Sequence, residues 1–171
     1  MMHSMFGTPP EAYFATRYAV LRQPLGMPLG SERLPDDAQA HHAWIEHQGE
    51  VIGVGRAHII PSNADGSGKD HDGPNAALIP PFGPLATGLA SRPAFQIRQM
   101  GTVSGHRRTG IARGILEALE QEMVHVHGAK TGFLQAREPA VPFYESQGWV
   151  VIDEPYGIAE IGPHRSMMKT F

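Results

Sequence analysis

The sequence contains no cysteine, and that absence excludes several classes of protein at once. Disulfide frameworks, cysteine nucleophiles and cysteine-ligated zinc or iron–sulfur centres all require thiols. A chain without thiols also fits a reducing compartment. We therefore expect no thiol chemistry and a cytoplasmic location.

Long apolar runs and an excess of positive charge are absent as well. No apolar stretch approaches the length of a membrane span, and Met1 to Pro10 lacks the basic start and apolar run of a signal peptide.

A formal charge of −3 gives no general attraction to nucleic acid or anionic lipid. A nucleic-acid-binding domain built on Arg107 and Arg108 would need a basic face and exposed aromatic residues. We expect a soluble protein with neither a nucleic-acid nor a membrane partner.

The length and the hydrophobic content predict one compact domain over residues 1–171. With 171 residues, of which 41% are hydrophobic, the chain can bury a full core and has little room for a second.

The pattern of apolar residues predicts an α/β domain with a mixed sheet. Gln48-Gly49 is typical of a hairpin turn between two strands. We expect helices at 10–22, 110–127 and 139–147, and strands at 43–47, 51–60, 95–102, 131–136, 149–152 and 166–169.

The helix expected at 110–127 is amphipathic and should pack on the sheet. Gly128 is placed to end it, and polar residues occupy its other faces. Its apolar face is formed by Ile111, Ile115, Leu119, Met123 and Val126.

Residues 62–93 are longer than a hairpin connection needs. Their first half is flexible in composition and their second half is apolar but interrupted by prolines. A segment of this length in a small domain is often functional or mobile. We interpret it as an insertion that carries a substrate lid or an oligomer contact, with a disordered surface loop as the alternative.

Residues 95–116 predict a strand, a basic glycine-containing turn and the start of a helix. Backbone N–H groups in the first turn of a helix lack internal acceptors, and the helix dipole adds positive potential there. Gly110 lets a phosphate approach the backbone, and Arg107, Arg108 and Arg113 supply positive charge. The segment therefore favours binding of a pyrophosphate-containing cofactor.

Neither the Walker phosphate loop nor the dinucleotide-binding glycine pattern occurs here. Arg107-x-x-Gly110-x-Ala112 instead resembles the acetyl-CoA signature of the GNAT N-acetyltransferases, and it follows a strand as in that family. A second block, from Glu138 to Trp149, is similar to the family's Ala-x-x-Phe-Tyr-x-x-x-Gly-Phe segment. A third, from Tyr156 to Met167, looks like the closing segment of the small bacterial ElaA-like members.

This resemblance implies a single N-acetyltransferase domain with a mostly antiparallel central sheet and helices on both faces. It implies transfer of an acetyl group from acetyl-CoA to a primary amine of a small molecule, peptide or protein, by direct attack in a ternary complex. It is also compatible with a homodimer, which the 62–93 insertion could either serve or block. The alternative is a non-catalytic acyl-CoA-binding module of the same fold.

The resemblance also assigns roles to individual residues. Tyr144 would be the general acid for the CoA sulfur, since a phenol of ordinary pKa near 10 is protonated at neutral pH. Glu138, Glu160 and His164 remain as candidates for the base, with water as a further one. The cofactor would be held by Met100, Gly101 and Thr102 on the strand, and by Arg107, Arg108, Thr109, Gly110, Ile111, Ala112 and Arg113 in the turn.

Two further features bear on the site. Family members often carry an asparagine three residues before Ala140, where this chain has Arg137, so the contacts to pantetheine there stay open. His41-His42 and His125-x-His127 do not reproduce a zinc-binding spacing, and we expect no metal.

Overall fold

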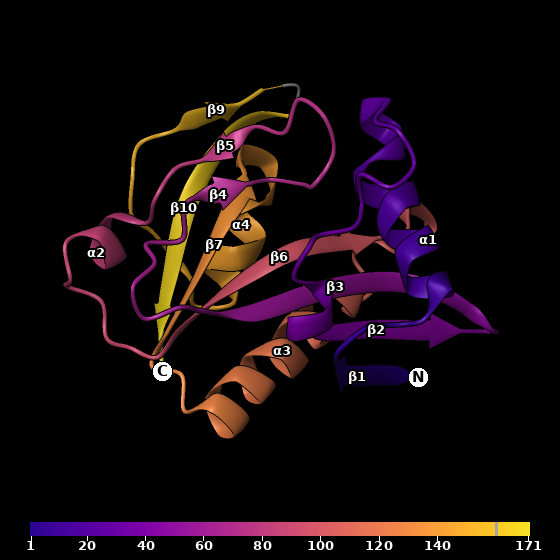
Figure 1. Cartoon of the computed structure of the whole chain (residues 1–171). Coiled ribbons are helices and arrows are strands. Elements are labelled where there is room, and N and C mark those ends of the chain that lie inside the picture. Colours follow the sequence, from indigo (N-terminus) through magenta and orange to yellow (C-terminus); the bar gives the residue numbers. More distant parts are fainter. Residues whose placement is uncertain (160) are drawn as a thin grey trace.

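In the computed structural model, which describes residues 1–159 and 161–171, a twisted sheet carries helices on both faces (Figure 1). The α-helices are α1 (Glu11–Leu21), α2 (Gly83–Ala86), α3 (Ile111–His127) and α4 (Val141–Ser146), and the 3-10 turns are η1 (Gln23–Leu25), η2 (Asp37–Gln39), η3 (Ser104–His106) and η4 (Glu138–Ala140). The strands are β1 (Met2–Phe6), β2 (His41–His47), β3 (Glu50–Ile60), β4 (Gly68–Lys69), β5 (Leu78–Ile79), β6 (Ala94–Thr102), β7 (Thr131–Arg137), β8 (Val150–Val151), β9 (Tyr156–Ile158) and β10 (Gly162–Thr170).

The main sheet has eight strands in the order β1-β2-β3-β6-β7-β10-β8, with β9 paired to β10. Within the described chain, β6 and β7 are the parallel pair of this sheet and its other pairs are antiparallel. The predicted mixed, mostly antiparallel sheet with helices on both faces is therefore confirmed. The predicted hairpin is also confirmed, because β2 and β3 pair across Gln48 and Gly49, both at positive φ.

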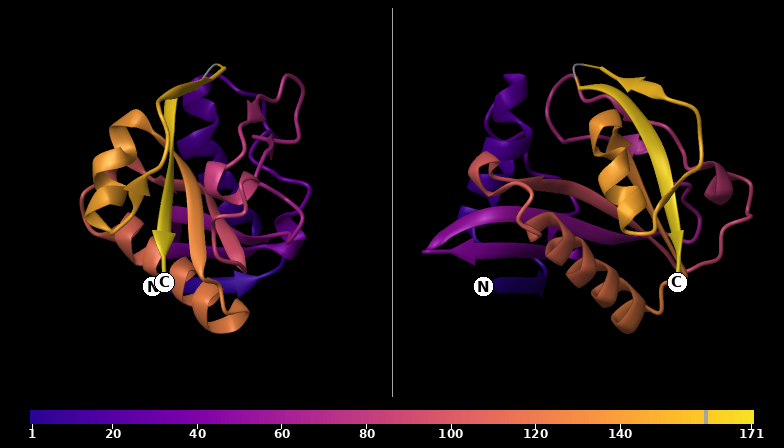
Figure 2. Two further views of the ribbon diagram at one scale, coloured as in Figure 1. Left: turned by 90° about the vertical axis from the view of Figure 1, so that its left-hand side faces the viewer. Right: turned by 180° about the vertical axis from the view of Figure 1, so that it is seen from behind.

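The helices α1 and α3 cover opposite faces of the first half of the sheet (Figure 2). Tyr13 of α1 packs with Val54 of β3, whereas the missing Cβ positions of Gly53 and Gly55 point at the side chains of α3. Alternate residues of a strand face opposite sides of a sheet, so β3 packs against α1 on one face and against α3 on the other.

Strands β6 and β7 lie together at one end and separate toward the other, as Figure 1 shows near the C-terminus. They pair only between Ala94–Gln96 and Thr131–Phe133. The register of β6 against β3 also shifts at Gln99, which has φ 56°. A bulge of this kind bends a strand and re-aims its side chains. The two strands therefore leave an opening in the middle of the sheet.

Helix α3 matches its prediction except in its last turn. Ile115, Leu119 and Met123 are buried, and Gly128 ends the helix with φ 63° and a hydrogen bond from its N–H to Val124. The prediction for Val126 was wrong, because its side chain is 62% exposed. A straight helix drifts relative to a seven-residue repeat, and in this turn the inward position is taken by His127, whose Nε2 lies 2.8 Å from Nε2 of His41.

Several short elements were missing from the sequence-based prediction. They are β1 at the edge of the sheet, β9, and the elements β4, β5 and α2 inside the 62–93 insertion. The insertion is packed onto the domain, since Phe82 is fully buried and its ring centre lies 4.9 Å from that of Phe133. This packing argues against the alternative of a disordered loop.

Candidate active site

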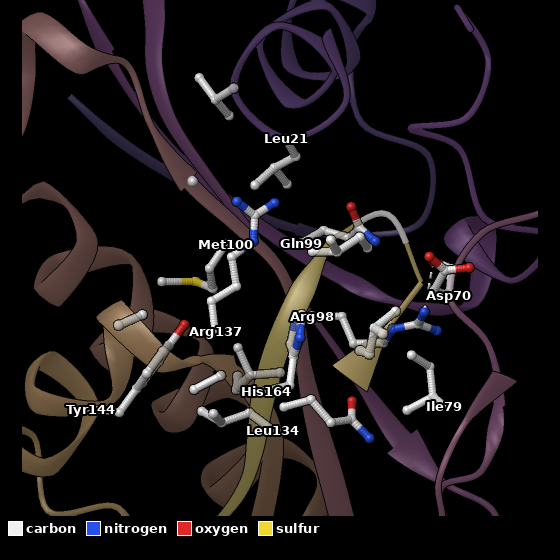
Figure 3. A pocket seen from close by; sticks show the side chains of 18 of the residues that line it. Leu21, Asp70, Ile79, Arg98, Gln99, Met100, Leu134, Arg137, Tyr144 and His164 are labelled. Atoms are coloured by element: carbon white, nitrogen blue, oxygen red, sulfur yellow. Dashed lines mark hydrogen bonds between the residues drawn. The ribbon is translucent and has the colours of Figure 1, made fainter. Parts of the chain in front are cut away.

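A cavity of about 310 Å³ lies where β6 and β7 separate (Figure 3). Its walls come from the end of α1, the insertion, the bulged part of β6, the β6–α3 connection, β7, α4 and the β9–β10 hairpin. Of the predicted site residues, it brings together Met100, Gly101, Thr102, Arg107, Tyr144 and His164.

The connection from β6 to α3 presents backbone N–H groups at the start of the helix. Arg108 has φ 61° and Gly110 has φ 85°, so both adopt the left-handed conformation. The N–H of Gly114 bonds to the carbonyl of Gly110 at 3.0 Å, and the three preceding N–H groups, those of Ile111–Arg113, have no acceptor within the helix. Such a turn followed by a helix N-terminus is suited to bind an anion.

The arginines of this connection differ in their surroundings. Arg107 lines the cavity, and Arg108 is exposed beside it. Arg113 donates from Nε to Glu117 at 2.8 Å, a contact that raises the pKa of Arg113. Arg107 and Arg108 are therefore the side chains of this turn best placed to meet a phosphate group.

Gly101 lines the cavity, and its lack of a side chain is also needed for packing. A Cβ at this position would lie 2.6 Å from Cγ2 of Val20 and 3.1 Å from Cδ2 of Leu21. The glycine thus lets α1 pack against β6. The backbone of Gly101 still borders the cavity.

Tyr144 of α4 projects into the cavity, and Figure 3 shows its phenol oxygen turned toward the interior. The residue is 8% exposed, and burial raises the pKa of its hydroxyl. The ring packs against Phe143 and Trp149, with centroid separations of 5.0 and 6.4 Å. Tyr144 is therefore held rigidly, and its hydroxyl remains protonated at neutral pH.

His164 of β10 lies on the wall of the same cavity and is 5% exposed. Its Nδ1 lies 2.8 Å from the carbonyl oxygen of Gly162, so Nδ1 carries the hydrogen and donates it. Burial lowers the pKa of His164, and the positive charge of Arg137 acts in the same direction. The ring is therefore neutral at pH 7, with its Nε2 lone pair available.

The other two candidates for the base are placed differently. Glu138 of η4 does not line the cavity, and its Oε2 is buried without a hydrogen-bond partner among the described residues. Glu160 lies outside the described residues. Of the predicted bases, His164 is the one that the structure places at the cavity.

Among the residues of the cavity that were not predicted as site residues, three are charged, namely Arg22, Asp70 and Arg98. They come from the end of α1, from the insertion and from β6. Their positions follow from long-range packing, and no local pattern in the sequence indicates them. Arg137, noted only as a departure from the family pattern, also lines the cavity.

Two negative findings concern the part of the chain that is described. No group of three or more histidine, aspartate or glutamate side chains there is arranged to hold a metal ion. No described helix has both the length and the apolar character needed to cross a bilayer.

The sequence is similar to known acetyltransferases. The family described as "Acetyltransferase (GNAT) domain" matches residues 86–171. The uncharacterized N-acetyltransferase YitI of Bacillus subtilis (strain 168) is 28% identical over 95 residues, which cover 56% of this chain and 61% of YitI. The aligned part is thus less than two thirds of that relative's length.

The fold is similar to that of solved structures over nearly the whole chain. Escherichia coli ElaA superposes with a TM-score of 0.72 at 15% identity, covering 99% of this chain and 98% of ElaA. An aminoglycoside 6'-N-acetyltransferase complexed with coenzyme A gives a TM-score of 0.60 at 15% identity, covering 99% and 96%. At these identities the likeness concerns the fold.

Proposed function

The chain belongs to the GNAT acetyltransferase family, and on that premise we propose that it transfers an acetyl group from acetyl-CoA to a primary amine. The observation that carries the proposal is the cavity between β6 and β7, which joins the anion-binding turn before α3 to Tyr144 and His164. This arrangement supports a direct reaction between two substrates that occupy the cavity together.

The residues present fit an acyl-CoA. The first turn of α3 offers free backbone N–H groups, and Arg107 and Arg108 add positive charge for a pyrophosphate. Beyond Gln96, the edge of β6 that faces the cavity has no described strand partner, so an extended pantetheine chain can lie along it. When bound, acetyl-CoA supplies the activated acetyl group as a thioester.

The two side chains at the cavity supply the proton transfers. The amine nitrogen must lose a proton as it forms the new C–N bond, and Nε2 of His164 accepts that proton. The C–S bond breaks with its electron pair on sulfur, and the Tyr144 hydroxyl donates a proton to the departing thiolate. The products are an N-acetyl amide and free coenzyme A.

Calorimetric titration with acetyl-CoA tests the cofactor site. We expect micromolar binding to the wild type and its loss in Gly110→Glu, which places a negative charge at the anion-binding turn. Gly88→Glu is the matched control, because Gly88 also has positive φ, at 73°, and also has open space around its Cβ position. Retained binding in Gly110→Glu would remove this turn from the proposal.

The alternative function, a non-catalytic acyl-CoA-binding module, predicts the same binding but no acetylation of any amine. A screen of amines with the wild-type protein separates the two. The cytoplasmic location and a homodimer stay predictions, to be checked by cell fractionation and by sedimentation.

A further inference from the structure

A set of charged residues in the cavity has no part in the chemistry above. Among the described residues that line it, and apart from Arg107 in the cofactor turn, the charged ones are Arg22, Arg98, Arg137 and Asp70. The wall of this part of the cavity therefore carries three guanidinium groups and one carboxylate. Neutral His164 adds no charge.

Two of these arginines hold the insertion in place. Nη2 of Arg22 donates to the carbonyl oxygen of Asp70 at 3.1 Å, and Nη2 of Arg98 donates to the same oxygen at 2.9 Å. The Asp70 carboxylate accepts a hydrogen bond from the backbone N–H of Ala77 at 2.9 Å. These contacts fix the wall that the insertion contributes to the cavity.

Hydrogen-bonding capacity remains on two of the guanidinium groups. Arg22 is 4% exposed, and its Nε has no hydrogen-bond partner among the described residues. Arg137 makes no hydrogen bond or ion pair with the described part of the chain. Its partial burial lowers the pKa of its guanidinium group. Arg22 is thus a buried charged group with an unused donor, and Arg137 is exposed at the cavity wall with no partner among the described residues, so the two can bind an anion that enters the cavity.

The two groups line the same cavity, Arg22 from the end of α1 and Arg137 from the end of β7. Burial is the largest cause of the lowered pKa of Arg22, and the positive charge of Arg137 is a smaller cause in the same direction. Arg137 also pairs directly with His164 in the register of β7 and β10. An anion at Arg137 would therefore sit beside the ring that accepts the proton of the amine.

We propose that Arg137 and Arg22 bind a carboxylate of the acceptor, so that the preferred substrates are amines that carry a nearby carboxylate, as amino acids do. A guanidinium group donates two parallel hydrogen bonds to a carboxylate, which gives both affinity and orientation. The inference rests on the proposed function, because it names the substrate class of the same cavity.

The first test is a turnover screen with the common α-amino acids, their carboxamides and the corresponding decarboxylated amines. Rates are compared at equal concentrations of neutral amine, because the three classes differ in amine pKa. We expect the acids to be preferred, and Arg137→Gln to reduce kcat/KM for them about tenfold or more while leaving the amides unchanged. Arg137→Lys, which keeps the charge, should retain part of the preference.

Arg33→Gln is the control variant. Arg33 pairs with Glu11 and does not line the cavity, so its removal should leave the preference intact. The affinity for acetyl-CoA should be the same in wild type and Arg137→Gln. A loss of acetyl-CoA binding in Arg137→Gln would assign Arg137 to the cofactor site and overturn the inference, as would equal turnover of acids and amides.

A binding experiment separates this inference from the transfer activity. The same amino acids are titrated into protein saturated with coenzyme A, which cannot react. If acids bind to the wild type and not to Arg137→Gln while no amine is acetylated, the carboxylate site stands and the proposed function fails. If acids neither bind nor react, the carboxylate site is overturned.

Discussion

Tyr144 is the side chain whose chemistry is easiest to isolate, because its ring and its hydroxyl have separate tasks. The ring packs against Phe143 and Trp149, and the hydroxyl faces the cavity. Tyr144→Phe keeps the packing and removes the proton donor. We expect kcat to fall on the order of 100-fold with little change in acetyl-CoA affinity, as measured by steady-state kinetics and calorimetry.

Tyr18→Phe provides the control for this prediction. The Tyr18 hydroxyl donates to the carbonyl of Met27 at 3.1 Å and does not line the cavity, so its loss should leave kcat unchanged. Wild-type turnover in Tyr144→Phe would show that water protonates the leaving thiolate.

His164 makes a prediction about pH. As a base it must be neutral, and burial lowers its pKa below the ordinary value of 6.5. Lowering the pH protonates Nε2, so kcat/KM, calculated on the concentration of neutral amine, should hold to lower pH than an ordinary histidine would allow and should then decline. In His164→Gln that acidic decline should disappear and the rate should be at least about tenfold lower.

The pH profile needs a parallel measurement of folding. Circular dichroism at each pH shows whether the protein is still native where the rate declines. A profile of unchanged shape in His164→Gln would assign the decline to another group and remove His164 as the base.

At the level of secondary-structure elements, the feature that forms the cavity is the separation of β6 from β7. The sequence predicted the neighbouring elements but not all of this arrangement. The strand, turn and helix around Gly110 follow from local patterns, whereas the separation of the two strands depends on tertiary packing. The bulge at Gln99 had no signal, because glutamine rarely adopts positive φ and tertiary contacts must impose it. Strand β1 was missed because a five-residue edge strand depends on its pairing with β2.

The contact between β3 and α3 depends on glycines. A Cβ at Gly55 would lie 2.5 Å from Sδ of Met100 and 2.6 Å from Cγ2 of Ile115. Gly55→Val should therefore push α3 away from the sheet and lower the free energy of unfolding by roughly 1–3 kcal/mol. Denaturant unfolding measures the change.

The control for this substitution is Gly157→Val in β9. Gly157 is also in a strand, but no atom lies within 4 Å of its Cβ position. The two variants should differ clearly in unfolding midpoint. Equal midpoints would mean that the helix adjusts to the added side chain at no cost.

For the protein as a unit, function depends on segments that are far apart in the sequence. Tyr144 and His164 could be nominated from local motifs that resemble those of a family. Arg22 and Asp70 could not, because their meeting requires α1 and the insertion to fold onto the sheet first. Local motifs thus nominated two side chains of the cavity, whereas its charged groups Arg22 and Asp70 are placed by long-range contacts.

The same long-range packing makes the stability of the whole protein depend on pH. His42 is fully buried beneath α1, with Nε2 2.8 Å from the carbonyl oxygen of Asp37, and burial lowers its pKa to about 4. The unfolded chain regains the ordinary pKa near 6.5 and therefore binds more protons than the native state between these values. Lowering the pH from 6.5 to 5 should reduce the free energy of unfolding for this residue with a slope that rises toward a limit of about 1.4 kcal/mol per pH unit.

His58 acts in the same sense, since burial and the charge of Arg56 lower its pKa to about 3. His42→Gln should therefore remove part of the slope and His42→Gln with His58→Gln a larger part, whereas His125→Gln, at an exposed position, is the control. Urea unfolding at several pH values above 5 measures the slope before most carboxylates titrate. An identical slope in the double variant and the wild type would mean that both rings already accept protons in the native protein, and that their surroundings are open to water.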